Sequence, residues 1–172
     1  MATTHLISVE EYLRTTYRPD VDYVDGEIQE RNLGELDHGT IQGAFMFYLG
    51  PRRREWNIRA VTELRVQVKE ERFRVPDVCI LDADAPKEQI IYHPPLVCIE
   101  VLSPSDTIYG MRQRVRDYVE MGVRQVWIVD PKDRTAIVCE GNSMVEQTDG
   151  TLKLPGTKIE VPLADLFSVL DE

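Results

Sequence analysis

The chain has 172 residues, 42% of them apolar, and a formal net charge of −10 at pH 7. This length fits one domain, 1–172, and the apolar share is large enough for a sizeable core and excludes a disordered composition. The acidic balance argues against a general nucleic-acid or membrane binder, because such proteins present broad positive potential, although a local basic groove is compatible with it. The apolar runs are far shorter than the roughly 20 residues of a membrane span, so no membrane partner is expected.

The cysteines point to a reducing compartment. Cys79, Cys98 and Cys139 form neither a zinc-binding spacing nor a disulfide framework. Cys79 and Cys98 lie inside apolar runs, where a buried and inert thiol is expected. We therefore expect the protein to be cytoplasmic.

The first part of the chain predicts two helices separated by a hairpin. Ser8 and Glu11 match the capping-box pattern, which begins a short helix that runs to about residue 15. The pair Asp25-Gly26 is a strong turn signal between two short strands. Apolar residues then recur at helical spacing over 36–49, so an amphipathic helix is expected there.

Strands dominate the rest of the chain. Alternating apolar residues at 59–68 predict a strand, and a hairpin at 69–71 then leads into the run that contains Asp77. The remaining elements are expected in this order: a polar loop at 83–95, a strand around Glu100, a helix at 110–121, strands at 124–129 and 135–139, a looser hairpin at 141–155 and a closing helix at 162–170. This order predicts a mixed α/β sandwich.

Two acidic residues lie inside apolar strands. Asp77 is part of the run 75–81, and Glu100 is part of the run 96–102. An unpaired buried carboxylate is costly, so an acid in such a strand is paired, neutralised or bound to a cation. With both acids on one side of the sheet, the other face of these strands enters the core. The residues of that face are Val78, Ile80, Ile99 and Val101.

The acidic pair predicts a divalent-metal site. Mg²⁺ takes hard oxygen ligands, typically one or two carboxylates together with water and substrate phosphate. Such a cation orients and acidifies water and offsets the charge that grows on a phosphodiester oxygen. Composition alone supports a second interpretation equally well, in which Asp77 and Glu100 are structural carboxylates, each bonded to an arginine or to a backbone amide.

Several motifs along the chain match one known family. They are VDGE at 24–27, a histidine at His38 that opens a helix, Pro76-Asp77, EVLSPS at 100–105, Tyr118, Gly122-Val123 and VWIVDP at 126–131. Together they resemble the bacterial Uma family of restriction endonucleases, a branch of the PD-(D/E)xK nuclease superfamily. The resemblance covers most of the chain.

The resemblance implies a restriction-endonuclease-like fold, in which helices flank a central mixed β-sheet. It implies that Asp77 and Glu100 hold Mg²⁺ or Mn²⁺, that the backbone carbonyl of Val101 is a third ligand, and that DNA is the substrate. Nucleases of this fold commonly dimerise, so a homodimer is compatible with the resemblance.

The chain departs from the family pattern at three positions. Leu102 replaces the superfamily lysine that usually follows the second acid. Relatives carry a lysine on the next helix, where this chain has Arg114, and often an aspartate four residues earlier, where it has Gly110. Arginine binds phosphate but is a poor base, so Arg114 is expected to act as an electrostatic clamp while water activated by the metal supplies the nucleophile. Asp106 is a candidate replacement for the missing aspartate.

His38 and Glu63 are further candidates. Three roles are open to His38: contact with the phosphate, relay of protons, or contact with the metal through water. Without the family context, a histidine in a first helical turn is more often a solvated or capping residue. Glu63 is a candidate accessory ligand in the same cleft, and an outward-facing strand acid is at least as well supported.

Two functions therefore compete. The first is a metal-dependent endonuclease that hydrolyses DNA phosphodiester bonds, with Arg114 in place of the usual lysine. The second is a catalytically degenerate nuclease fold that binds nucleic acid or a protein partner, which Arg114 and Gly110 favour. A purely structural or oligomeric protein is a third class. Titration with Mg²⁺ or Mn²⁺ separates the first from the other two.

Overall fold

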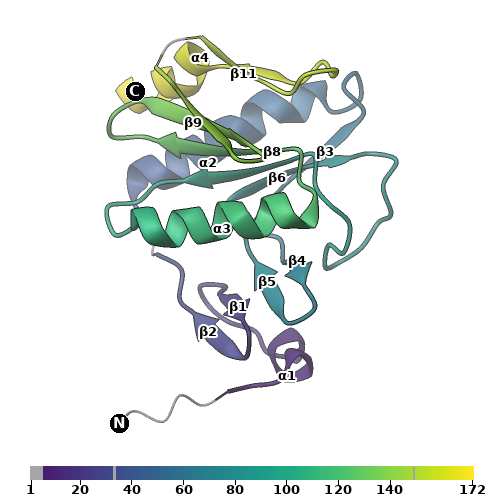
Figure 1. Ribbon diagram of the computed structural model, residues 1–172. Helices are drawn as coiled ribbons and strands as arrows, with labels where there is room; N and C mark the ends of the chain where they lie inside the picture. The colour runs from purple at the N-terminus through teal and green to yellow at the C-terminus, as the bar shows by residue number, and fades with distance from the viewer. Residues whose placement is uncertain (1–5, 33, 149) are drawn as a thin grey trace.

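A six-stranded mixed sheet forms the centre of the computed structural model, which describes residues 6–32, 34–148 and 150–172 (Figure 1). Its strand order is β10-β9-β8-β7-β6-β3. The strands are β3 (Ile58–Thr62), β6 (Val78–Asp82), β7 (Val97–Val101), β8 (Gln125–Asp130), β9 (Thr135–Glu140) and β10 (Ser143–Gln147). β7 and β8 pair in parallel, and the other neighbours pair antiparallel.

Two long helices cover this sheet, one on each face. Figure 1 shows α3 (Ile108–Met121) in front of the sheet and α2 (Leu36–Leu49) behind it. α3 is the connection between the parallel strands β7 and β8, which need a long crossover of this kind. Thr107 caps the start of α3 by accepting a hydrogen bond from the amide of Gly110, and Gly122 ends it in a left-handed conformation with φ of 105°.

Smaller elements extend the fold at two ends. A four-stranded antiparallel sheet of order β2-β1-β5-β4 lies below the large sheet in Figure 1. It comprises β1 (Asp22–Val24), β2 (Glu27–Gln29), β4 (Val66–Lys69) and β5 (Arg72–Arg74), and the helix α1 (Val9–Arg14) lies beside it. The opposite end holds β11 (Thr151–Lys153), β12 (Glu160–Pro162) and α4 (Leu163–Ser168). Short 3-10 helices follow α2 and α4, at Gly50–Arg52 and Val169–Asp171.

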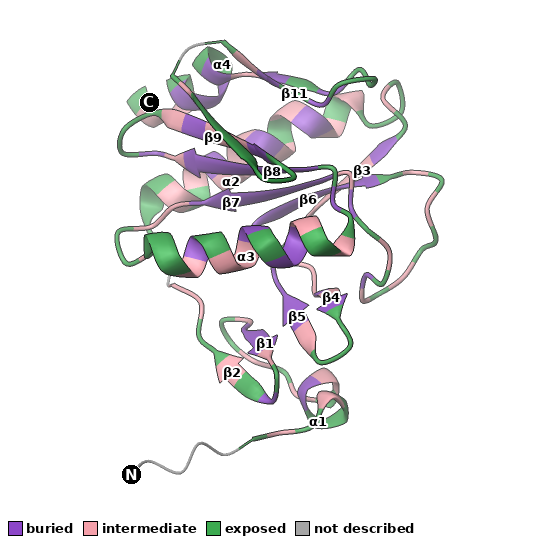
Figure 2. Cartoon of the chain, viewed as in Figure 1, coloured by how far each residue is buried: buried purple, intermediate pink, exposed green. Residues whose placement is uncertain are grey.

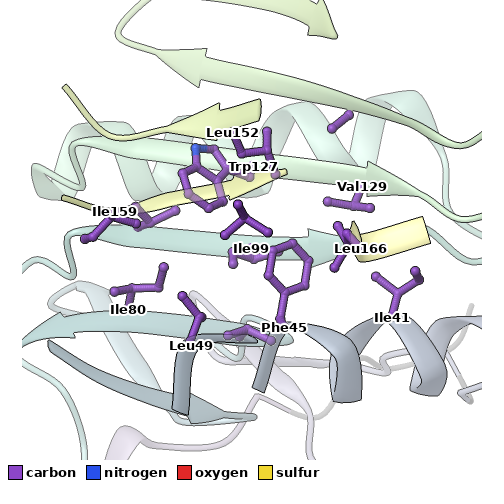
Figure 3. Packing of buried hydrophobic residues seen from close by; sticks show 14 of the residues in the cluster. Ile41, Phe45, Leu49, Ile80, Ile99, Trp127, Val129, Leu152, Ile159 and Leu166 are labelled. Carbon is purple, nitrogen blue, oxygen red and sulfur yellow. The ribbon is translucent and has the colours of Figure 1, made fainter. Parts of the chain in front are cut away.

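The central strands are buried on both faces, as Figure 2 shows by their purple colour. On the α2 face, residues of the sheet such as Ile80, Ile99 and Trp127 pack against Phe45 and Leu49 (Figure 3). The predicted core positions Val78, Ile80, Ile99 and Val101 all belong to this cluster. Cys79 and Cys98 lie on the α3 face and pair directly across β6 and β7. Both thiols are free and fully buried, as expected from the sequence.

Most of the elements expected from the sequence are present. The mixed α/β fold class is confirmed, as are the helix at 36–49, the Asp25-Gly26 hairpin and the Ser8 cap, whose hydroxyl accepts a hydrogen bond from the amide of Glu11. No helix in the described part of the chain combines the length and the apolar character that a membrane crossing requires.

The single strand expected at 59–68 is wrong. The chain forms β3 and β4 there, and these strands belong to different sheets. Glu63 lies between them with a positive φ of 50°, a conformation that interrupts an extended strand. The looser hairpin expected at 141–155 is also wrong, because β10 pairs back onto β9 and β11 pairs with β12.

Candidate active site

Asp77 and Glu100 face each other across two neighbouring strands. Asp77 immediately precedes β6, and Glu100 lies in β7. The antiparallel register that pairs Val78 with Ile99 places Asp77 across from Glu100. Both residues are almost completely buried, with exposed fractions of 3% and 2%. The strand pairing therefore brings two carboxylates together at one edge of the core.

The Asp77 carboxylate is held by groups from three parts of the chain. Arg31, in the loop before α2, donates from Nη2 to Oδ1 at 2.6 Å. The Val101 amide donates to Oδ2 at 2.7 Å, and His38 Nε2, in the first turn of α2, lies 3.3 Å from Oδ2. The hydrogen bond to Asp77 raises the pKa of His38 above its ordinary value, against the opposing effect of burial, because the carboxylate favours the imidazolium form.

The Glu100 carboxyl group is held mainly from α3. Tyr118 donates its hydroxyl to Oε1 at 2.6 Å, and Arg114 Nη1 lies 3.5 Å from Oε2. Burial raises the pKa of Glu100 to about 7, and the nearby charge of Asp77 adds to the rise, while Arg114 and Tyr118 oppose it. Glu100 therefore exchanges a proton near neutral pH. Tyr118, which the sequence marked only as part of a family motif, orients this acid.

The raised pKa of Glu100 predicts a pH-dependent stability. The folded protein binds a proton at Glu100 up to about pH 7, whereas the unfolded chain releases it near pH 4.5. Between these pH values the folded state holds more protons, so the free energy of unfolding contributed by this group falls as the pH rises. At about 1.4 kcal/mol per pKa unit, the total loss is on the order of 3 kcal/mol.

Urea denaturation between pH 4 and pH 8 measures this dependence. Glu100→Gln is expected to remove most of the decline, because glutamine keeps the shape and can still accept the Tyr118 hydrogen bond without titrating. Glu27→Gln, at an exposed position of β2, serves as the control and should retain the wild-type slope. An unchanged slope in Glu100→Gln would show that this carboxyl group titrates normally.

Arg114 lies among three carboxylates. Besides its contact with Glu100, its Nε is 3.6 Å from Asp22 Oδ2 and its Nη1 is 3.6 Å from Asp106 Oδ1. These distances exceed the 2.7–2.9 Å that is typical of charge-assisted hydrogen bonds. Arg114 is therefore shared among the acids and is not locked onto one of them. Arg112 and Arg116, which lie two residues before and after it in α3, are exposed.

A buried ionic network centred on Arg74 contacts Arg114 through a shared aspartate. Arg74, only 2% exposed, donates to the carboxylates of Asp22 and Asp117, and Asp22 also faces Arg114. Gln29 accepts a further hydrogen bond from Arg74. This network links the small sheet to α3 and ends at the site. The sequence carried little signal for it, since Arg74 ends the strand Arg-Phe-Arg and Asp22 begins β1, positions where a charged residue is usually exposed.

The remaining candidates lie at the margin of this pair. The exposed Glu63 has its carboxylate 3.9 Å from Arg31 Nη1, and its amide donates to the Asp77 carbonyl at 3.3 Å. Asp106 accepts hydrogen bonds from the amide and hydroxyl of Ser103 as well as facing Arg114. A cavity of about 770 Å³ adjoins the site, and its lining includes His38 and Asp106.

The oxygen atoms around Asp77 and Glu100 are of the type that Mg²⁺ prefers as ligands. The described residues contain no cluster of three or more carboxylate, thiol or imidazole groups arranged to hold a metal ion. A cation between Asp77 and Glu100 would therefore rely on two carboxylates, main-chain oxygen and water, a combination common for Mg²⁺. The amide of Val101 points to Asp77, and the carbonyl of an extended residue lies on the same edge of its strand as the amide.

The arginine contacts are also compatible with the second interpretation, in which Asp77 and Glu100 are structural carboxylates. Arg31 is bonded to Asp77, and Arg114 lies beside Glu100, so each acid has a cationic neighbour. A metal ion there has to share or displace these side chains. Arg31 lies in a polar stretch with no periodic pattern, so no sequence signal pointed to this site residue.

Comparison with known proteins identifies the family. Residues 9–163 match the Uma2 family, described as "Putative restriction endonuclease". The chain belongs to the Uma2 family. Membership confirms the resemblance noted in the sequence and supports a nuclease. No curated protein matches this Uma2 chain.

One solved structure shares the fold over nearly the whole chain. This Uma2 protein is similar to a structure from Anabaena variabilis ATCC 29413, described as a "putative nuclease belonging to DUF820", with a TM-score of 0.83 and 21% identity, covering 95% of this chain and 99% of that chain. At this identity the likeness shows the fold alone. A DrdV–DNA complex aligns with a TM-score of 0.43 and 17% identity over 76% of this chain and 10% of that chain, which is too distant to bear on the fold or the site.

Proposed function

We propose that this Uma2 protein is an endonuclease that hydrolyses DNA phosphodiester bonds with the help of Mg²⁺ or Mn²⁺. The observation that supports it is the facing pair of buried carboxylates, Asp77 and Glu100, in a chain of the Uma2 family. These two side chains would hold the cation together with the Val101 carbonyl. When bound, the cation supplies a Lewis acid that lowers the pKa of water and offsets charge on the phosphodiester oxygens.

The residues around the pair have separable tasks. The Val101 amide fixes Oδ2 of Asp77, and the Tyr118 hydroxyl fixes Oε1 of Glu100, so both carboxylates are held before a substrate arrives. His38, whose raised pKa favours its protonated form, directs Nε2 at Oδ2 of Asp77 and helps to hold that carboxylate in place. Arg114 cannot act as a base, because its pKa lies above the ordinary value of arginine, and it serves as a positive clamp beside Glu100.

Two exposed basic side chains would contact the DNA backbone. Arg112 and Lys132 are both exposed and line the cavity beside the acidic pair. Contacts of this kind position the duplex and carry little sequence information, so binding is expected to weaken steeply with salt. The net charge of −10 and the carboxylates in the same lining oppose this binding, so the bound cation would have to supply further positive charge toward the backbone; these carboxylates are Glu35, Asp37, Asp106 and Asp130.

A cleavage assay tests the proposal directly. Plasmid, single-stranded and branched DNA are incubated with the native protein in Mg²⁺, in Mn²⁺ and in a chelator, and binding of either metal is measured by calorimetry. We expect strand cleavage that requires the metal. The endonuclease assignment would be contradicted if no substrate were cleaved and no heat of metal binding were observed.

Arg114 gives a sharper prediction on the same assay. Arg114→Met is expected to lower the cleavage rate by roughly 10²-fold, in the range seen when one preorganised electrostatic stabiliser is removed. Arg114→Lys keeps the charge and should stay within about tenfold of the native rate, or 1.4 kcal/mol. Arg124→Met, at an exposed arginine bonded to the carbonyl of Pro155, should be neutral. Equal rates for Arg114→Met and the native protein would remove Arg114 from the mechanism.

The arginine contacts favour one alternative function. With Arg31 on Asp77 and Arg114 beside Glu100, the same fold can bind nucleic acid or a protein partner without cutting. A native protein that binds DNA without cleaving it, and that gains cleavage through Arg114→Lys, would be a nuclease fold that has lost catalysis.

A further inference from the structure

Arg31 occupies an unusual position for a loop arginine. Its side chain is only 10% exposed, and its two terminal nitrogens approach different carboxylates. Nη2 lies 2.6 Å from Oδ1 of buried Asp77, and Nη1 lies 3.9 Å from Oε1 of exposed Glu63. Burial alone would lower the pKa of Arg31, but the charges of Asp77 and Glu100 outweigh burial and raise it.

The two oxygens of Asp77 are held in different ways. Oδ2 accepts a hydrogen bond from the amide of Val101, which is part of β7 and cannot leave without distorting the sheet. The partner of Oδ1 is the guanidinium of Arg31, at the end of a long side chain carried by a loop. A cation that binds Asp77 therefore reaches Oδ1 by moving Arg31, because Oδ2 is held by the main-chain amide of Val101 and also faces Nε2 of His38.

We propose that Arg31 competes with the divalent cation for Oδ1 of Asp77 and, once displaced, binds a phosphate of the DNA substrate. The inference rests on the proposed function, because it takes the cation and the DNA from it. Glu63 keeps a carboxylate within reach of the displaced guanidinium at the exposed side of the site. The planar fork of a guanidinium matches a phosphate with two parallel hydrogen bonds, so the released side chain is suited to the substrate.

The competition gives Arg31 two opposite effects. While it pairs with Asp77, it weakens metal binding, because the cation has to replace an existing ion pair. After displacement, it strengthens DNA binding. Removing its charge should therefore tighten the metal and loosen the DNA. A purely structural arginine would weaken both together, since loss of its support would disorder the site.

Arg31→Met tests both effects in the full chain. Calorimetric titration with Mn²⁺ is expected to show binding roughly tenfold tighter than in the native protein, a factor that corresponds to 1.4 kcal/mol. Fluorescence anisotropy with a cleavage-resistant phosphorothioate duplex, in saturating Mn²⁺, is expected to show DNA binding roughly tenfold weaker. Should Arg31→Met fail to fold by circular dichroism, Arg31→Lys replaces it, with the same signs and smaller factors because the ammonium lacks the bidentate fork.

Arg65→Met is the matched control. Arg65 is also a largely buried arginine, 15% exposed, and it pairs with a carboxylate, Asp20, at 3.2 Å. It touches neither Asp77 nor Glu100, so its removal should leave both affinities unchanged.

The outcomes separate this inference from the proposed function. The competition is overturned if the native protein and Arg31→Met bind Mn²⁺ with the same affinity, or if Arg31→Met loses affinity for both Mn²⁺ and DNA. Either result leaves the proposed endonuclease function unaffected. Mn²⁺ binding that appears only in Arg31→Met supports the competition. No Mn²⁺ binding by either protein overturns the competition together with the metal-dependent function.

Discussion

Asp77→Asn is expected to reduce DNA cleavage by roughly 10²–10³-fold or more, the range found when one electrostatic stabiliser is removed from an active site. Asparagine keeps the shape and can still accept the hydrogen bond from the Val101 amide. It removes the charge that would hold the cation and that pairs with Arg31. Cleavage rates in Mg²⁺ and Mn²⁺, with calorimetric titration of each metal, measure the two losses side by side.

The matched control for this variant is Asp20→Asn. Asp20 is likewise an aspartate paired with an arginine, Arg65, but it is more exposed than Asp77 and lies outside the site. It should retain native cleavage and metal binding. Native cleavage by a folded Asp77→Asn protein would remove Asp77 from the chemistry and leave it the structural carboxylate of the alternative interpretation.

Arg74→Met is expected to produce the largest loss of stability. Arg74 is 2% exposed and donates to Asp22 and Asp117, which are 2% and 1% exposed. Removing Arg74 leaves Asp22 with the more distant Arg114 and leaves Asp117 with Arg72. The loss of one partner of a buried ion pair costs roughly 3–5 kcal/mol. The midpoint of urea denaturation should fall accordingly, and cleavage should fall with it because Asp22 also faces Arg114.

An exposed ion pair provides the comparison for Arg74. Arg134 pairs with Asp171 near the C-terminus, where both side chains are largely solvated. Exposed pairs contribute little to stability, so Arg134→Met should leave the denaturation midpoint nearly unchanged. A similar midpoint for the two variants would mean that the buried network is readily replaced by apolar packing.

The sequence by itself was sufficient for the fold class, for most of the helices and strands, and for the acidic pair. Alternation along β6 and β7 assigned Val78 and Ile99 to the core, and the cost of burying charge marked Asp77 and Glu100 as special. Helical spacing and a glycine stop located α2 and the end of α3. These features are short-range, because strand alternation, helical periodicity and capping act over a few residues.

Only the tertiary structure decided which charges meet. Arg31 reaches an aspartate 46 residues away, and Arg74 reaches Asp22 across 52 residues, contacts that no local period encodes. The division of 59–68 between two sheets, at the left-handed Glu63, likewise depends on where each half finds an edge to pair with. The pairing of buried charges follows from the path of the whole chain, because desolvation and Coulomb attraction depend on distance in space and not on distance along the sequence.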